Sequence, residues 1–377
     1  MSKATTESQR QAKPALTARR AGRLAAVLAA LGSTLVFMSS AQAAPAARAA
    51  VGSAVAGHAY RHGLVPTLAA HHATPAAVKA ACSTKCLHFR GGVSGVGVTT
   101  GKEQVYLVFW GSQWGTQGSN SSGYATFTGD PQGVAPDLQA FFKGLGTNGE
   151  LWSGVATQYC QGAAIGATRC TTAMAHVAYP TGGALAGVWE DNSAASPAQS
   201  SGHQLAVEAE LAATHFGRTT TASNRDAQYV IVSPTGTNPD NYQGSGFCAW
   251  HDYTGDSTLD GGGGASGSLI AFTNFPYIPD AGANCGAGFV NPGNILDGVT
   301  IVEGHEYTET ITDQFPVGGW TANNGEEIGD LCAWLTVGGG RAQNITLITG
   351  KFAVQGMWSN SANKGTGACA IKHAIST

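Results

Sequence analysis

Charged side chains are scarce in this sequence. Only 11% of its 377 residues are Asp, Glu, Lys or Arg, and 20 Lys plus Arg against 23 Asp plus Glu leave a formal net charge of −3. No strong overall field therefore attracts the chain to nucleic acid or to an anionic membrane surface, and we expect no nucleic-acid partner. The 53 glycines and the frequent neutral polar residues indicate a surface kept soluble largely without charge, which is typical of a secreted protein.

Membrane-length apolar runs are also lacking. The run "LAAVLAALGSTLVFM" at residues 24–38 is shorter than the roughly 20 residues that a spanning helix needs. It follows a cluster of arginines and precedes the small residues "AQA", which end at Ala43, so the pattern predicts a signal peptide over residues 1–43. We therefore expect a secreted, extracellular protein with no stable membrane insertion after cleavage.

Two common catalytic signatures are missing. No "GxSxG" elbow is present, because neither "GYATF" nor "GSGFC" supplies it and "VSPTG" has no glycine before its serine. This excludes the usual serine-hydrolase arrangement. The glycine-rich stretch at residues 261–264 has no lysine in P-loop order, so we expect a flexible hairpin loop there instead of a phosphate-binding loop.

All eight cysteines lie beyond the predicted signal peptide. An even number of cysteines in an exported chain indicates disulfides. The spacing "CSTKC" resembles half of a zinc site, but no second pair follows at finger-like spacing. The sequence leaves the connectivity open, and pairing of neighbours closes the shortest loops. We predict the pairs Cys82–Cys86, Cys160–Cys170, Cys248–Cys285 and Cys332–Cys369.

The segment at residues 44–90 is rich in alanine and contains several breakers of regular structure. We expect a linker or pro-segment without a catalytic role, followed by a single disulfide-stabilised domain over residues 91–377. The histidines of this segment could bind a metal only loosely, because a flexible stretch gives no fixed ligand geometry. These residues are His58, His62, His71 and His72.

The domain alternates between apolar runs of strand length and amphipathic segments of helix length. Strands are expected within residues 103–111, 173–180, 227–234, 247–253 and 267–277. Helices are expected within residues 135–146, 150–160 and 201–217, and from about 294 or 296 to 313. This alternation predicts an α/β fold of three layers, in which crossover helices cover a mixed, mostly parallel sheet. The last helix is the predicted zincin-like active-site helix of the C-terminal half.

Residues 301–314, "IVEGHEYTETITDQ", place several ionisable side chains on that last helix. His305 and Glu309 are one turn apart and point the same way, with Glu306 beside them. In zinc peptidases a "HExxH" helix supplies two ligands and a general-base glutamate. Here Glu309 takes the place of the second histidine, and a carboxylate binds Zn²⁺ at much the same distance as an imidazole does.

A metal would need ligands from outside this helix. "NNGEEIGDLCAW" supplies Glu327 and Asp330, and "CAWHDY" supplies His251 from a neighbouring strand. The alternative is a solvated acidic helix face with no metal. Nearby apolar residues, among them Trp320 and Trp334, favour burial of the helix, and a buried histidine beside carboxylates needs a metal or a hydrogen-bonded network.

Several of these stretches also resemble a known family. "EQVYLVFWGSQW", "AQYVIVSP", "GFCAWHDY", "GVTIVEGHEYTETITDQFPVGGW", "EEIGDLCAW" and "FAVQGMW" occur in the order found in the extracellular EXORDIUM-like, phosphate-induced proteins of plants and their bacterial relatives. The resemblance runs from about Lys102 to Ser359 and implies secretion and a site, but no substrate. It departs from the family in loops, at "DQFPVGGW" and at residues 261–264. The positions that it implies for the site are His251, His305, Glu306, Glu309, Glu327, Asp330 and Cys332.

These observations favour a secreted zinc-dependent hydrolase, in particular a peptidase, that acts on an extracellular peptide or a cell-wall substrate. His305, Glu309 and either Glu327 or Asp330 would hold Zn²⁺, and Glu306 would act as the general base. His251 would be a fourth ligand or would stabilise the oxyanion.

Two other functions stay open. A non-catalytic extracellular or cell-wall-associated EXORDIUM-like protein would keep the same carboxylates as a structural polar or Ca²⁺ site, since Ca²⁺ prefers oxygen ligands. A glycoside hydrolase would use two of the carboxylates and would stack sugars on Trp110, Trp114 and Trp320, although aromatic residues in strands are more often part of the core.

Overall fold

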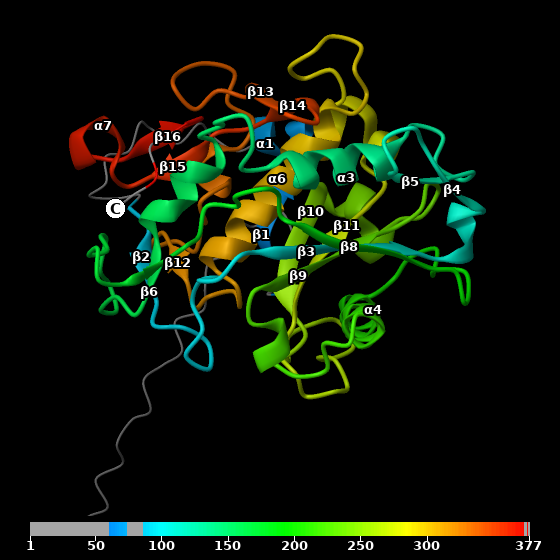
Figure 1. Ribbon diagram of the computed structural model, residues 1–377, viewed down its shortest axis with the longest axis horizontal. Coiled ribbons are helices and arrows are strands. Elements are labelled where there is room, and N and C mark those ends of the chain that lie inside the picture. The colour runs from blue at the N-terminus through cyan, green and yellow to red at the C-terminus, as the bar shows by residue number, and fades with distance from the viewer. Residues whose placement is uncertain (1–59, 74–85, 373–374, 376–377) are drawn as a thin grey trace, which may run out of the picture. The chain divides into compact units, whose positions relative to one another are not determined.

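The computed structural model describes residues 60–73, 86–372 and 375, and its centre is a six-stranded sheet (Figure 1). The strands are β1 His62–Pro66, β3 Gln104–Trp110, β8 Leu185–Asp191, β9 Ala227–Val232, β10 Phe247–Tyr253 and β11 Ala271–Phe275. They follow the order β1-β10-β11-β9-β3-β8 across the sheet. The last four in this order are parallel to one another, and β10 and β1 continue the sheet in antiparallel pairings. The predicted mixed, mostly parallel sheet is confirmed.

The strand β3 shows why both faces of the sheet are covered. Val105, Leu107 and Phe109 are buried in one apolar cluster, and the intervening Tyr106 and Val108 are buried in a second one. Successive side chains of a strand point to opposite faces, so the two clusters lie on opposite faces of the sheet. A strand covered on both faces reads as one continuous apolar run, as this one does.

Helices pack against each face (Figure 1). α3 (Val134–Gly144) and α6 (Asp297–Thr312) contribute to the first cluster, and α4 (Gly202–His215) contributes to the second. Ser201 begins α4 with a capping box: its hydroxyl accepts from the backbone N–H of Gln204, and the Gln204 side chain accepts from the Ser201 N–H. The result is a layer of helices on each side of the sheet.

Two predicted elements differ from those observed, and one observed strand was not predicted from the sequence. The helix predicted at 150–160 is a short 3-10 helix, η2 (Ser153–Gln158), and the strand predicted at 173–180 is only β7 (Ala175–His176). β8 is a strand of the central sheet that we did not expect. Its sequence, "LAGVWED", mixes apolar and acidic residues because it lies at the edge of the sheet, where most of its side chains are only partly buried.

Residues 44–90 contain more regular structure than a linker or pro-segment suggests. β1 pairs with β10 at the other edge of the sheet, and α1 (Leu68–Ala73) follows it. An edge strand tolerates Pro66, which has no N–H to donate. Pairing with β10 therefore forms a strand that the sequence pattern does not indicate. Residues 44–59 and 74–85 of this segment lie outside the described residues.

The other elements are short and surround the central layers. They are β2 His88–Phe89, β4 Gln117–Ser119, β5 Ala125–Phe127, β6 Cys160–Gln161, β12 Trp320–Thr321, β13 Gln343–Leu347, β14 Gly350–Val354, β15 Met357–Ser359, β16 Ala368–Ala370, α5 Tyr242–Ser245 and α7 Ala362–Gly365. The remaining 3-10 helices are η1 Ser112–Trp114, η3 Ala222–Asn224, η4 Pro239–Asn241, η5 Ile278–Cys285 and η6 Asp330–Cys332.

Disulfides tie several of these elements together. The predicted pairs Cys160–Cys170, Cys248–Cys285 and Cys332–Cys369 are confirmed. Cys86 is also disulfide-bonded, and its predicted partner, Cys82, lies outside the described residues. These bonds are consistent with the expected extracellular location, where disulfides form and persist.

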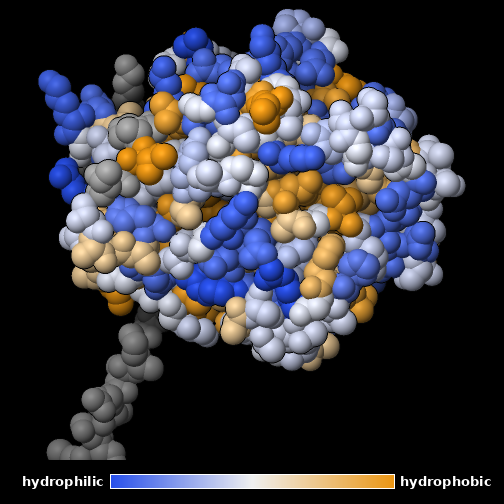
Figure 2. Space-filling view, in the orientation of Figure 1, coloured by the Kyte–Doolittle hydropathy of each residue, from blue (hydrophilic) through white to orange (hydrophobic). Residues whose placement is uncertain are grey.

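The surface exposes few large apolar groups. Figure 2 shows hydrophilic residues over much of one face, with apolar residues in small separate areas. Among the described residues, the large hydrophobic ones that are exposed are Leu151, Ile165, Leu211, Val317, Val337, Ile348 and Ile375. None of the helices in the described part of the chain has the length and apolar character of a membrane span.

Candidate metal centre

The helix α6 is buried along its whole length. All 16 of its residues are buried, including Glu303, His305, Glu306 and Glu309. It contacts the strands β1, β10, β11 and β14. The interpretation of this helix as a solvated acidic face is therefore wrong. Its ionisable groups lie inside the protein, where each needs a hydrogen-bond partner or a counter-charge.

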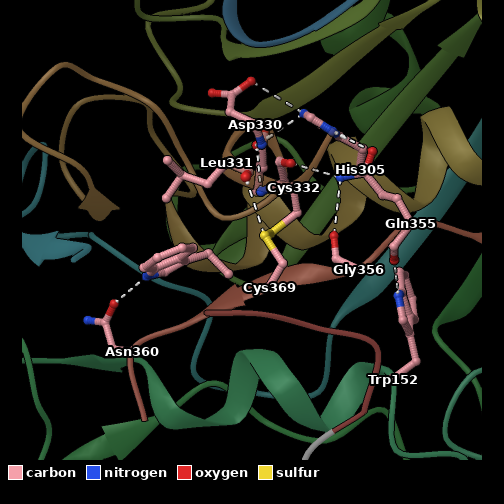
Figure 3. The surroundings of a disulfide bond; sticks show 12 residues. Trp152, His305, Asp330, Leu331, Cys332, Gln355, Gly356, Asn360 and Cys369 are labelled. Atoms are coloured by element: carbon pink, nitrogen blue, oxygen red, sulfur yellow. Dashed lines mark hydrogen bonds and ion pairs between the residues drawn. A yellow bond between two sulfur atoms is a disulfide. The ribbon is translucent and has the colours of Figure 1, made fainter. Parts of the chain in front are cut away.

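His305 is oriented by Gln355 (Figure 3). Its Nδ1 lies 3.2 Å from Gln355 Oε1, and Gln355 Nε2 donates to the carbonyl oxygen of Gly329 at 2.8 Å. Because a carbonyl only accepts, the second bond fixes Oε1 as the atom that faces His305, so Nδ1 is the donor. Nε2 then faces two carboxylates, at 3.1 Å from Glu309 Oε1 and 3.6 Å from Asp330 Oδ1. This is how a metal-binding imidazole is usually supported.

The two carboxylate oxygens of Glu309 have different surroundings. Oε1 accepts from the backbone N–H groups of Gly329 and Asp330, at 2.9 and 3.0 Å. Oε2 has no hydrogen-bond partner among the described residues and lies 3.8 Å from His251 Nε2. The first oxygen therefore anchors the Gly329–Asp330 turn to α6, and the second remains free to bind a cation.

His251 brings the sheet into the same cluster. It is fully buried in β10, and its Nε2 lies 3.2 Å from Glu327 Oε2. The backbone N–H of Glu327 donates to Asp330 Oδ2 at 2.9 Å, so a tight turn holds these two acidic residues together. The strand β10, the helix α6 and the Glu327–Asp330 turn thus bring the predicted site residues together.

Glu306 is the least satisfied group of the cluster. Both of its carboxylate oxygens are buried and, within the described part of the chain, neither accepts a hydrogen bond. Its ligand atom lies within 4.8 Å of those of His251 and Glu309. Glu306 is therefore close enough to a cation in this cluster to bind it or to act beside it, and its predicted role as general base stays a prediction.

Burial raises the pKa values of the acidic groups in the cluster. It raises the pKa of Glu306 and of Glu327 well above the usual 4.5, and nearby carboxylates add to the effect for Glu327. Burial, followed by the neighbouring Asp330, raises the pKa of Glu309 to about 7. These three carboxyl groups therefore retain protons at pH values where exposed ones do not. A divalent cation bound here would favour their charged form.

The two imidazoles are shifted in opposite directions. Burial lowers the pKa of His251 well below 6.5, and the proximity of His62 and His305 lowers it further. Burial also tends to lower the pKa of His305, but the neighbouring Glu309 and Asp330 outweigh this effect and hold the pKa well above 6.5. His251 is therefore neutral, as a metal ligand must be, while His305 carries a proton until a cation replaces it.

The donor set fits a divalent metal ion. Two groups of ligand atoms each lie within 4.8 Å of one another: His251 with Glu306 and Glu309, and His305 with Glu309 and Asp330. Zn²⁺ accepts imidazole nitrogen together with carboxylate oxygen, whereas Ca²⁺ prefers oxygen alone. The unpartnered oxygens of Glu306 and Glu309 are the atoms that a cation would satisfy.

The strand β1 closes the cluster on one side. At Gly63 a Cβ atom would lie 1.9 Å from Glu309 Oε2 and 2.6 Å from His251 Nε2. Any other residue would clash with the cluster, and φ at this position is +53°, which glycine adopts most easily. The backbone of β1 therefore packs directly on the two side chains.

Three contributors to the site were not predicted from the sequence. Gln355 and Gly63 reach the cluster only through tertiary packing. Glu303, one turn before Glu306 on α6, is fully buried, has no hydrogen-bond partner among the described residues, and has its pKa raised well above 4.5 by burial. Its position on a helix of charged residues could have identified it, had the burial of the helix been known.

Three further residues have structural surroundings. Asp313, at the end of α6, accepts backbone N–H bonds from the Val317–Gly319 turn, so its role is structural. Trp114 and Trp320 are fully buried and cannot present a flat face to a sugar, whereas Trp110 is partly buried. Two of the three tryptophans suggested for sugar stacking therefore belong to the core.

Comparison with known proteins gives no relative on which function could be based. No family model matches the chain, and no curated protein and no solved structure matches it significantly.

Proposed function

We propose that this protein is a secreted zinc-dependent hydrolase, in particular a peptidase, whose centre lies between α6, β10 and the Glu327–Asp330 turn. The observation that carries the proposal is that Glu309 Oε2 lies in one buried cluster with His251 and Glu306. Neither this oxygen nor the two carboxylate oxygens of Glu306 have a hydrogen-bond partner among the described residues. Burying such a set of ligand atoms without partners lowers the stability of the fold unless a cation binds there.

The ligands in this proposal are His305, Glu309 and Asp330 on one side and His251 and Glu327 on the other. When bound, Zn²⁺ supplies Lewis-acid polarisation of a carbonyl group. Gln355 keeps the lone pair of His305 on Nε2, and the two backbone bonds to Glu309 Oε1 fix the direction of Oε2.

Glu306 is the proposed general base. It takes a proton from the attacking water and returns it to the leaving amine, which requires a pKa nearer neutrality than that of an ordinary carboxyl group. The burial that raises the pKa of Glu306 acts in this direction. The substrate class is an extracellular peptide or a cell-wall component, and the α6 helix plays the part of a zinc-peptidase helix. The resemblance to EXORDIUM-like proteins belongs to the same proposal.

A second candidate is a non-catalytic extracellular protein with a structural metal. It is favoured by one observation: His251, His305, Glu306 and Glu309 have no solvent-exposed surface, and β1 lies over His251 and Glu309. A structural site needs no route for substrate, whereas a hydrolase needs β1 to move.

The two candidates differ in what Glu306 does. The test uses the full chain, its zinc content by mass spectrometry, and cleavage of casein with and without a chelator. For the hydrolase, Glu306→Gln should lower the rate by roughly 10²- to 10⁴-fold. Glu326→Gln, a change of the same kind at a partly exposed neighbour, should leave the rate unchanged. Cleavage that survives both the chelator and Glu306→Gln would refute the hydrolase, and zinc without cleavage would establish the structural role.

A further inference from the structure

A second group of metal-ligand atoms lies outside the centre described above. His62 of β1, Asp252 of β10 and Asp256 of the following turn place one ligand atom each within 4.8 Å of the others. His62 Nε2 lies 3.6 Å from Asp256 Oδ2. The sequence of residues 44–90 predicts a flexible stretch that gives its histidines no fixed geometry, but the pairing of β1 with β10 supplies that geometry for His62.

Asp252 is the residue that needs an explanation. It is fully buried, and its Oδ1 accepts from the backbone N–H of Tyr253 at 2.7 Å. Its Oδ2 is buried without any hydrogen-bond partner in the described residues, although it belongs to a cluster with a second carboxylate. Two carboxylates this close, one of them fully buried, repel each other unless one keeps a proton or positive charge lies between them.

Asp256 is oriented by two hydrogen bonds from Thr258. The backbone N–H of Thr258 donates to Oδ1 at 2.7 Å, and the Thr258 hydroxyl donates to Oδ2 at 2.8 Å. The side chains of His62 and Asp256 retain 18% and 12% of their exposure, so an ion can reach the cluster from solvent. A rigid, partly open set of three ligands is thus present at the surface end of β10.

We propose that His62, Asp252 and Asp256 bind a divalent cation of the zinc class. One imidazole nitrogen and two carboxylate oxygens are a donor set that Zn²⁺ accepts readily, while Ca²⁺ and Mg²⁺ favour oxygen alone. The cation neutralises both carboxylates and satisfies the free oxygen of Asp252.

This ion would fasten β1 to the sheet. His62 precedes Gly63, the residue whose backbone lies on Glu309 and His251. An ion bound by His62 and by the end of β10 therefore holds in place the strand that covers the first centre. This regulatory part rests on the proposed function, and the existence of the ion does not.

The first test is the zinc content per chain. The purified full chain is equilibrated with Zn²⁺, desalted and measured by mass spectrometry. Asp252→Asn should contain about one ion less than the wild type, because it removes a ligand. Asp260→Asn removes an exposed carboxylate from the same loop and should lose none. Equal zinc content in Asp252→Asn and wild type would overturn the site.

Two further variants keep the result independent of folding and of catalysis. His62→Gln changes a partly exposed side chain, so it should fold and should also lose about one ion. His305→Ala removes a ligand of the first centre only and should retain the second ion. If Asp252→Asn and His62→Gln lose zinc while no form of the protein cleaves casein, the cation site stands and the proposed hydrolase falls.

The second test is protease access to β1. Limited proteolysis of residues 60–73 should be several-fold faster in Asp252→Asn than in the wild type with Zn²⁺, because the strand opens more often. Asp260→Asn should be cut at the wild-type rate. Equal rates in Asp252→Asn and the wild type would overturn the fastening role.

Discussion

His305 Nδ1 and Gln355 Oε1 lie 3.2 Å apart, and this contact determines which nitrogen of the imidazole faces the carboxylates. Gln355 itself is held by the carbonyl oxygen of Gly329, the residue that also donates to Glu309. One amide side chain thereby links the histidine of the helix to the turn that carries Asp330. The orientation of the candidate ligands is set by this network as well as by the helix.

Replacing Gln355 should therefore weaken metal binding. In Gln355→Leu the bond that keeps the lone pair of His305 on Nε2 is lost, and the loss of such a supporting partner typically costs 10- to 100-fold in affinity. The measurement is the zinc dissociation constant by competition with a chromogenic chelator. Gln132→Leu, at an exposed site, is the control and should bind as the wild type does. Unchanged affinity in Gln355→Leu would mean that His305 is not a ligand.

Gly63→Ala should destabilise the fold more than an ordinary glycine substitution does. The added methyl group would lie 1.9 Å from Glu309 Oε2, so β1 must move. Gly149→Ala is the control, because φ is +67° there and no atom lies within 4 Å of the added group. We expect about 1 kcal/mol for the control from backbone conformation alone, and at least about 1 kcal/mol more at Gly63. Urea denaturation measures both, and equal losses would contradict the close packing of β1.

The metal-free protein should be more stable in mild acid than at neutral pH. Burial raises the pKa of Glu309 from 4.5 to about 7, and burial raises those of Glu103 and Glu208 from 4.5 to about 8. A group whose pKa is higher in the folded state stabilises that state below its unfolded pKa, and this contribution is lost as pH rises through the folded pKa. Stability should thus fall between about pH 4.5 and 8.

The measurement is the urea midpoint in the presence of a chelator at intervals across this pH range. Zinc should reverse the trend near neutral pH, because binding to deprotonated carboxylates competes with protons. Adding Zn²⁺ should raise the midpoint more at pH 7.5 than at pH 5. A metal-free protein that gains stability over this range would show that these carboxyl groups are not buried as described.

The Cys332–Cys369 disulfide should support the site as well as the fold. Cys332 ends the 3-10 helix that begins at Asp330, so the bond fixes the turn that carries this ligand (Figure 3). Replacing both cysteines by serine should lower the free energy of unfolding by about 2–4 kcal/mol and should weaken zinc binding. The same change at Cys160 and Cys170 should lower stability without a comparable loss of zinc affinity. Equal effects of the two double variants on zinc affinity would contradict the local role.

The helix and the strands of the site could be predicted because their patterns are local. Periodicity placed His305 and Glu309 on one side of a helix, and the observed helix, Asp297–Thr312, begins and ends close to the predicted residues. The continuous apolar runs of β3 and β9 identified strands covered on both faces. Spacing along one element is enough for such predictions.

Nearby apolar residues favoured some burial of α6, but its burial on every side has no such local pattern. The helix carries polar residues around its whole circumference, so it shows no apolar stripe, and only packing against β1, β10 and β14 encloses it. The same is true of Gly63 and Gln355, whose contacts join segments that are far apart in the sequence. Long-range packing supplies these features, and no local pattern specifies them.

The strand β1 has a kinetic consequence. Because it lies over Glu309 and His251 with no room for even a methyl group, an ion held between these two side chains leaves only when the protein opens locally. Its residence time is then set by the frequency of that opening, and not by the strength of the chelator outside. At high chelator concentration every local opening ends with the chelator binding the released ion, so the rate of zinc release should no longer depend on chelator concentration. This limiting rate measures how often β1 separates from the sheet.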